Sequence, residues 1–101
     1  MCDHLIDIKA VSRTALRRLP GLLNLWLPDG KVRNGEWVAR NPTRNDHQAG
    51  SFLINLRTGK WSDFATGDSG GDIVSLYAYL KNLSQYEAAK QLADVLEGGY
   101  V

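Results

Sequence analysis

The sequence is poor in the features that mark secreted and membrane proteins. Its 101 residues contain one cysteine, Cys2, which cannot form an internal disulfide and suits a reducing compartment. No run reaches the roughly 18 to 20 consecutive apolar residues that a membrane span needs. The first residues lack the basic segment and apolar run of a secretory signal. We therefore expect a cytoplasmic protein.

Catalytic motifs are also missing. The two histidines, His4 and His47, stand apart, and the chain has no Ser/His/Asp or Cys/His arrangement and no Walker-type phosphate loop. Asp63, Asp68 and Asp72 surround a glycine-rich turn, but three acids at one turn are a weak signal for a catalytic magnesium site. We expect a protein that is not an enzyme by itself and that uses no cofactor.

The chain does contain enough apolar residues for one small core, together with an uneven distribution of charge. Hydrophobic residues make up 44% of the sequence, and its length fits a single domain, residues 1–101. Residues 1–60 hold ten Lys/Arg against five Asp/Glu, whereas residues 61–101 hold two against six. The basic half could present a positive face to a polyanion, or both halves could be ordinary solvated surface.

Residues 1–30 are predicted to form a helical N-terminal segment. A helix over residues 7–19 is indicated by apolar side chains at helical spacing, namely Ile8, Val11, Ala15, Leu16 and Leu19. Pro20-Gly21 interrupts this pattern. A short helical turn over residues 22–27 follows, and we expect Trp26 on that turn to be a core residue.

Residues 36–65 are predicted to form a small antiparallel sheet. Three short runs rich in aromatic and β-branched residues, 36–40, 51–56 and 60–64, are separated by turn signals. Phe52, Ile54 and Leu56 alternate as the buried face of a strand would. Residues 57–60 have the composition of a hairpin turn between the last two strands.

Residues 72–97 are predicted to form two helices after a glycine-rich loop over residues 66–72. Asp72 is expected to cap the first helix, because Asp68 and Asp72 would repel a phosphate at that helix end. Ser84 and Glu87 form a capping box at the start of the second helix. That helix is expected to end at Gly98-Gly99 and to bury Ala89, Leu92, Ala93 and Leu96. The predicted class is α+β.

Five short motifs follow one another in a fixed order across this region. They are Trp37-Val38-Ala39-Arg40-Asn41-Pro42, Gly50-Ser51-Phe52, Thr58-Gly59-Lys60-Trp61-Ser62-Asp63-Phe64, Gly70-Gly71-Asp72-Ile73-Val74 and Glu87-Ala88-Ala89. In this order and spacing, the chain resembles the zinc-ribbon domain at the front of DnaG-type and phage-type DNA primases. Residues 7–97 are similar to the N-terminal region of large primase-like proteins from phages and mobile elements.

The resemblance implies a zinc-ribbon-like sheet, but the metal ligands of that family are absent. The corresponding positions hold Asn41, Arg44, Asp63 and Thr66, which cannot supply the thiolates and imidazole of a tetrahedral zinc site. We therefore expect no bound metal. Because a structural zinc can contribute on the order of 10 kcal/mol to folding, its loss needs an offset. Candidate offsets are an ion pair between Arg44 and Asp63 and aromatic packing by Trp26, Trp37, Trp61 and Phe64.

Basic and aromatic residues interleave along the predicted strands, as they do in proteins that hold single-stranded nucleic acid. The candidate DNA-binding residues are Arg40, Arg44, Arg57, Lys60 and Trp61. Phe52 and Phe64 are instead assigned to the core. Lys9, Arg13 and Arg17, with Arg18 beside them, form a basic stripe on the first helix that we interpret as its solvated face.

The sequence therefore favours a non-catalytic, DNA-binding accessory module of a phage or mobile-element replication system. Its partners would be DNA, more readily single-stranded, and a polymerase or helicase. One alternative is a protein-interaction module that binds or inhibits a host complex such as a defence nuclease. Exposure of Leu22, Leu23, Leu25 and Trp26 would support this alternative. Another alternative is a structural fragment of a larger primase-like chain.

Overall fold

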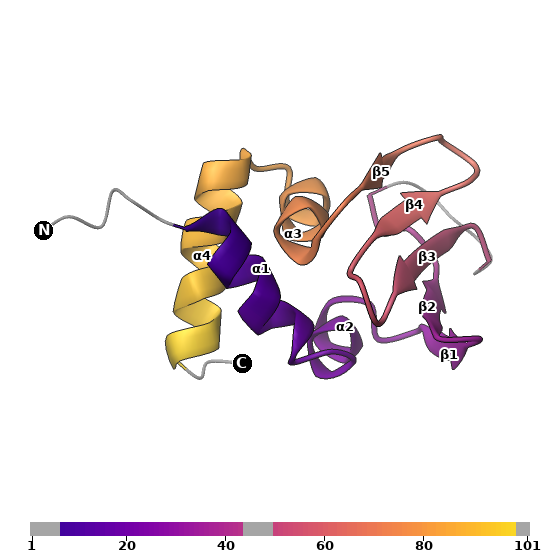
Figure 1. Cartoon of the computed structure of the whole chain (residues 1–101). Coiled ribbons are helices and arrows are strands. Elements are labelled where there is room, and N and C mark those ends of the chain that lie inside the picture. Colours follow the sequence, from indigo (N-terminus) through magenta and orange to yellow (C-terminus); the bar gives the residue numbers. More distant parts are fainter. Residues whose placement is uncertain (1–6, 44–49, 99–101) are drawn as a thin grey trace, which may run out of the picture.

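Helices lie on one side of a small antiparallel sheet in the structure, a computed structural model that describes residues 7–43 and 50–98 (Figure 1). The described elements are, in chain order, α1 (Ile8–Leu16), α2 (Gly21–Trp26), β1 (Lys31–Arg33), β2 (Glu36–Ala39), β3 (Phe52–Asn55), β4 (Trp61–Asp63), β5 (Ser69–Gly70), α3 (Ile73–Lys81) and α4 (Gln85–Gly98). The predicted α+β class is confirmed. Within the described part of the chain, no helix combines the length and apolar character that crossing a membrane demands.

The five strands lie in the order β1-β2-β3-β4-β5, and each is antiparallel to its neighbour. The turn between β1 and β2 is formed by Asn34 and Gly35, whose φ angles are 53° and 77°. Two successive positive φ angles are typical of the type I′ turn, whose twist matches that of the strands it joins. This turn fixes the register of β1 on β2.

The helix and strand boundaries partly differ from those predicted. Three of the five strands, β2 to β4, were predicted, whereas β1 and β5 were not. The first helix begins as expected, with Asp7 accepting a hydrogen bond from the Ala10 amide, but it ends at Leu16 rather than at residue 19. Residues 17–20 form turns that lead into α2.

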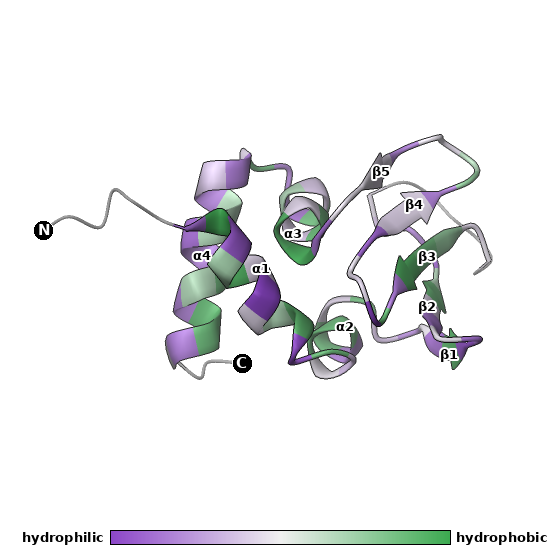
Figure 2. Cartoon of the chain, viewed as in Figure 1, coloured by the Kyte–Doolittle hydropathy of each residue, from purple (hydrophilic) through white to green (hydrophobic). Residues whose placement is uncertain are grey.

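One face of the sheet and the facing sides of the helices form the core. The sheet contributes Trp37, Ala39, Phe52, Ile54 and Trp61, and α3 contributes Ile73, Val74 and Leu76. Figure 2 shows β2 and β3 as the most hydrophobic strands. Trp26, predicted as a core residue, is only half-buried, and its ring packs on Tyr77 with centroids 5.2 Å apart. Ala93 is likewise only partly buried.

The predicted Asp72 cap and the Ser84 half of the predicted capping box are present at the C-terminal helices. The Asp72 carboxylate accepts a hydrogen bond of 2.8 Å from the Ser75 amide, which confirms Asp72 as the N-cap of α3. The Ser84 hydroxyl accepts a hydrogen bond of 3.1 Å from the Glu87 amide at the start of α4. These caps fix where α3 and α4 begin, and α3 then lies against the inner face of the sheet.

Candidate nucleic-acid interface

The two faces of the sheet have different surroundings. Trp37, Ile54 and Trp61 lie opposite one another across β2, β3 and β4, and all three belong to the core. Because side chains alternate along a strand, their neighbours point the other way. Val38 illustrates this alternation, since it is only 7% exposed yet lies outside the core cluster. We call the face that carries Val38 the outer face.

The alternation of side chains along each strand and the register between strands identify the residues of the outer face. Its residues are Lys31, Arg33, Glu36, Val38, Arg40, Ser51, Leu53, Asn55, Lys60, Ser62, Phe64 and Ser69. Two backbone hydrogen bonds continue the pairing beyond the strand ends. The Asn55 amide donates to the Lys60 carbonyl at 2.8 Å, and the Phe64 amide donates to the Ser51 carbonyl at 2.9 Å. Among the described helices, none packs on this face, because their buried residues belong to the core on the opposite side.

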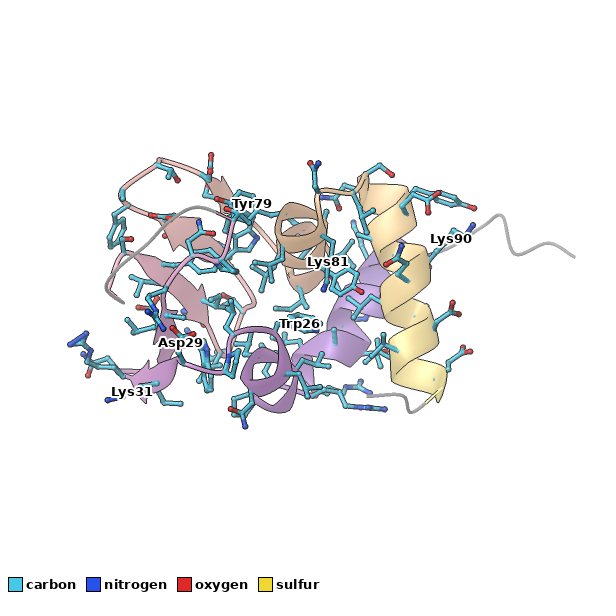
Figure 3. All side chains as sticks on the ribbon, turned by 180° about the vertical axis from the view of Figure 1, so that it is seen from behind. Trp26, Asp29, Lys31, Tyr79, Lys81 and Lys90 are labelled. Atoms are coloured by element: carbon cyan, nitrogen blue, oxygen red, sulfur yellow. The ribbon has the colours of Figure 1, made fainter. Side chains whose placement is uncertain are left out.

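Four exposed cations lie on the outer face: Lys31, Arg33, Arg40 and Lys60. Lys31 and Arg33 come from β1 and line a hollow of about 370 Å³ together with Val38. Figure 3 shows Lys31 and Asp29 at the β1 edge of the sheet. The one acid within the strands of this face, Glu36, lies opposite Arg33 and is half-buried. The face therefore carries a net positive charge.

Arg40 is held in place by Asp29. Its Nε donates to Asp29 Oδ2 at 2.7 Å, and both side chains are well exposed. This hydrogen bond lowers the pKa of the Asp29 carboxyl below its ordinary value. The pair orients the guanidinium on the outer face but offsets part of its charge.

The two aromatic residues of β4 and its continuation differ in burial. Trp61, predicted both as a packing residue and as a residue that stacks on bases, is 4% exposed and packs against Phe52 and Tyr79, with ring centroids 6.0 and 4.6 Å away. Its packing is confirmed. Its ring offers no free face to a base, so the stacking prediction is wrong. Phe64, assigned to the core, is 72% exposed. The aromatic side chain beside the cations is therefore Phe64, whereas the core assignment of Phe52 is confirmed.

The remaining two predicted DNA-binding residues are Arg57 and Arg44. Arg57 is exposed in the turn between β3 and β4, at one end of the outer face, and its amide donates to Asn55 Oδ1 at 2.8 Å. Arg44 lies outside the described residues, as does its proposed ion pair with Asp63. Sequence reasoning missed Lys31 and Arg33 because it did not predict β1, although the Asn34-Gly35 pair was a hairpin signal.

Two of the positions that the primase resemblance aligns with metal ligands, Asn41 and Asp63, meet inside the protein. Asn41 Nδ2 donates to Asp63 Oδ2 at 2.8 Å and lies 2.8 Å from the Tyr79 hydroxyl oxygen, and that hydroxyl donates to Asp68 Oδ2. We call these four residues the Asn41–Asp63 network. Thr66 is exposed, and it joins this network only at its edge: its amide donates to the Asp63 carbonyl at 3.3 Å, and its hydroxyl accepts from the Asp68 amide at 3.1 Å.

The Asn41–Asp63 network does not fit a structural zinc site. Its side chains are amide, carboxylate and phenol groups, and the Asn41 amide nitrogen is directed at the Asp63 carboxylate instead of leaving that oxygen for a metal. Within residues 7–43 and 50–98, no group of three or more His, Cys, Asp or Glu side chains gathers in one place. Hydrogen bonds therefore connect β2, β4 and α3 where the resemblance would place metal ligands.

The apolar stretch around α2 does not form a surface patch. Leu22 and Leu23 are buried in the core, Trp26 packs on Tyr77, and only Leu25 is strongly exposed. One exposed leucine is ordinary for a protein surface. The observation that would have supported a protein-interaction module is therefore missing in this part of the chain.

The basic stripe on α1 is exposed, as predicted for a solvated helix face. Lys9, Arg13 and Arg17 are open to solvent, and Arg18 donates a hydrogen bond of 3.1 Å to the Leu96 carbonyl at the end of α4. These residues belong to the helical layer and not to the outer face.

Comparison with protein-family models, curated proteins and solved structures gives no match to this chain.

Proposed function

We propose that the outer face binds single-stranded DNA without catalysing a reaction on it. The observation that carries this proposal is the gathering of Lys31, Arg33, Arg40 and Lys60 with the exposed Phe64 on one open sheet face. Proteins hold single strands by placing cations along the backbone and aromatic rings under the bases. The outer face offers both groups within one surface.

The shape of the face favours an unpaired strand over a duplex. A major groove admits a helix or a two-stranded ribbon. The outer face spans five strands, with β1 and β5 at its edges, and is therefore too broad to enter such a groove. A flexible single strand can instead lie across it, with its bases near Leu53 and the exposed Phe64.

The cellular role follows from the resemblance of the five motifs to primase zinc-ribbon domains. In that setting the protein would be an accessory module in the replication system of a phage or mobile element. It would hold the template strand while a polymerase or helicase partner acts on it. Phosphate contacts would come from the cations, and the Asn41–Asp63 network would have a structural role only.

The test is binding to labelled single-stranded and double-stranded oligonucleotides across a salt series. Substitution of Lys31, Arg33 or Lys60 by Ala is expected to lower affinity for single strands. Each lost phosphate contact should reduce the slope of log K against log salt by about 0.7. Lys81→Ala and Lys90→Ala are matched controls, because both lysines are exposed on helices away from the outer face.

Two results would overturn the proposal. The first is no binding to any oligonucleotide even at low salt. The second is an equal loss of affinity in the control variants, which would mean that the protein responds to net charge and has no defined interface. Preferential binding of duplex would also contradict the geometric reasoning about the width of the face.

A further inference from the structure

A second hollow lies beyond the β5 edge of the sheet. It is a groove of about 670 Å³ bordered by β4 and β5, by α3 and by the first residue of α4. The polar side chains that line it include those of Ser69, Ser75, Tyr79, Asn82 and Gln85. Among the described residues, no charged side chain lines it. The groove is thus suited to a neutral, hydrogen-bonding group and not to a phosphate.

Several of these polar groups have no hydrogen-bond partner. Trp61, which also lines the groove, is 4% exposed, and its Nε1 hydrogen-bond donor is unpaired. The side chains of Ser69, Ser75, Asn82 and Gln85 likewise make no hydrogen bond among the described residues. Buried donors without partners are rare in folded proteins, and each calls for an explanation. The Trp61 Nε1 atom itself is shielded from solvent, whereas the side chains of Ser69, Asn82 and Gln85 are exposed along the groove and available to a ligand.

Gly70 keeps the backbone of β5 close to this cluster. A Cβ atom at residue 70 would collide with Trp61 Nε1 and Ser75 Oγ. The indole nitrogen and the serine hydroxyl therefore lie close to the backbone of residue 70. A side chain at this residue would displace them, whereas glycine lets both groups stay near each other.

The groove is continuous with the outer face. Ser69 pairs with Ser62, and Ser62 in turn lies opposite Leu53, so Ser69 ends the row of outer-face residues that begins at Lys31. Ser69 also lines the groove. A strand that crosses the outer face toward β5 therefore arrives at the mouth of the groove.

We propose that this groove receives one unstacked nucleobase of the strand bound on the outer face, an inference that rests on the proposed function. Base edges present hydrogen-bond donors and acceptors side by side, and the amides of Asn82 and Gln85 supply both kinds of group. Single-strand readers commonly turn a base out of the stack and contact its edge in this way. The outer face supplies affinity, and the groove supplies base preference.

The test compares homopolymeric oligonucleotides dA, dC, dG and dT of one length with an abasic oligonucleotide. The wild-type protein is expected to prefer one base over the other three by roughly tenfold, the discrimination of one good base contact. Stacking on Phe64, by contrast, separates every base from the abasic strand alike. The variant combines Gln85→Ala with Asn82→Gly. Glycine at residue 82 removes the amide and retains the left-handed backbone, whose φ is 58°. This variant should lose the preference and keep its affinity for the abasic strand.

A matched control is Asn24→Ala, which removes an exposed amide on α2 that borders neither the groove nor the outer face. It should leave the base preference unchanged. Binding without base preference, or a preference that survives in the double variant, would overturn the groove assignment while leaving the proposed function intact. Absence of binding to every oligonucleotide, the abasic strand included, would instead mark the failure of the proposed function itself.

Discussion

The side-chain amide of Asn41 donates a hydrogen bond of 2.8 Å to the carboxylate of Asp63, and each residue is only 1% exposed. The other end of the amide is also engaged, since Asn41 Oδ1 accepts from the Thr43 amide at 2.9 Å. That backbone contact fixes which end of the amide faces Asp63. The chain leaving β2 is thereby attached to β4 through polar groups that are shielded from water.

Replacement of Asp63 by Ala should strongly destabilise the fold. The carboxylate accepts from Asn41 and, through Oδ1, from the Ala65 amide at 2.8 Å. Its removal leaves buried donors unsatisfied, for which we expect a loss of about 2 to 4 kcal/mol in the free energy of unfolding. Urea denaturation measures this quantity. Asp94→Ala, on the exposed side of α4, is the control and should change stability by less than about 0.5 kcal/mol. An unchanged urea midpoint in the Asp63 variant would mean that the network contributes nothing.

A strong chelator should leave the thermal unfolding midpoint unchanged. Of the positions that the primase resemblance aligns with metal ligands, Asn41 and Asp63 are hydrogen-bonded to one another and Thr66 is exposed. None of the three supplies a thiolate or an imidazole. A protein whose fold depends on structural zinc loses much of its stability when the metal is removed. Calorimetry before and after dialysis against the chelator provides the measurement. A fall of many degrees would show that metal-binding residues exist that the described part of the chain does not reveal.

The sequence predicted the class of the fold and the central strands because their apolar alternation is strong. Strand β1 gave no such signal, since all three of its residues are exposed and it is held by the Asn34-Gly35 turn and its pairing with β2. Strand β5 comprises two residues inside a glycine-rich segment. Short edge strands of this kind depend on a neighbouring strand and not on a hydrophobic face of their own.

The difference in burial between Trp61 and Phe64 has a related cause. The two residues are three positions apart, so they point to opposite faces of the sheet. Hydrophobicity alone directs both inward, and that is impossible in one continuous strand. The structure buries Trp61 together with Asp63, because Asn41 and the Ala65 amide satisfy the carboxylate. The sequence does not reveal that these partners lie within reach, so it cannot predict which aromatic side chain remains exposed.

Substitution Phe64→Ala should weaken DNA binding without affecting stability. The side chain is 72% exposed, so its removal should change the free energy of unfolding by no more than about 0.5 kcal/mol. Loss of one stacked base should lower binding by about 1 to 3 kcal/mol. Fluorescence anisotropy with a labelled single strand measures the binding change. Tyr86→Ala, an exposed aromatic on α4, is the control, and an equal effect of both variants would remove Phe64 from the interface.

The Arg40–Asp29 pair predicts a specific dependence of stability on pH. The hydrogen bond from Arg40 lowers the pKa of Asp29 from its ordinary value of 3.8. A carboxyl whose pKa is depressed by folding stabilises the protein above its unfolded pKa, and this contribution is lost as pH falls through the folded pKa. Since both side chains are exposed, Arg40→Ala should cost at most about 1 kcal/mol at neutral pH. Urea unfolding at a series of pH values should show this difference shrinking as the pH falls below 3.8. A difference that persists unchanged in acid would assign the loss to packing by the arginine stem.

The Arg40–Asp29 pair also predicts a substitution that strengthens DNA binding, whereas replacement of the cations by Ala weakens it. Asp29 lies beside Arg40 and offsets its charge, so Asp29→Asn should strengthen binding to single strands while the neutral side chain still accepts the hydrogen bond. The gain should be largest at low salt, and the slope of log K against log salt should steepen by up to about 0.7 as Arg40 engages a phosphate more fully. The double variant Asp29→Asn with Arg40→Ala should lose this gain, because no guanidinium then remains at that position. If Asp29→Asn alone leaves affinity unchanged at every salt concentration, Arg40 does not contact the strand, and the interface would be limited to Lys31, Arg33 and Lys60.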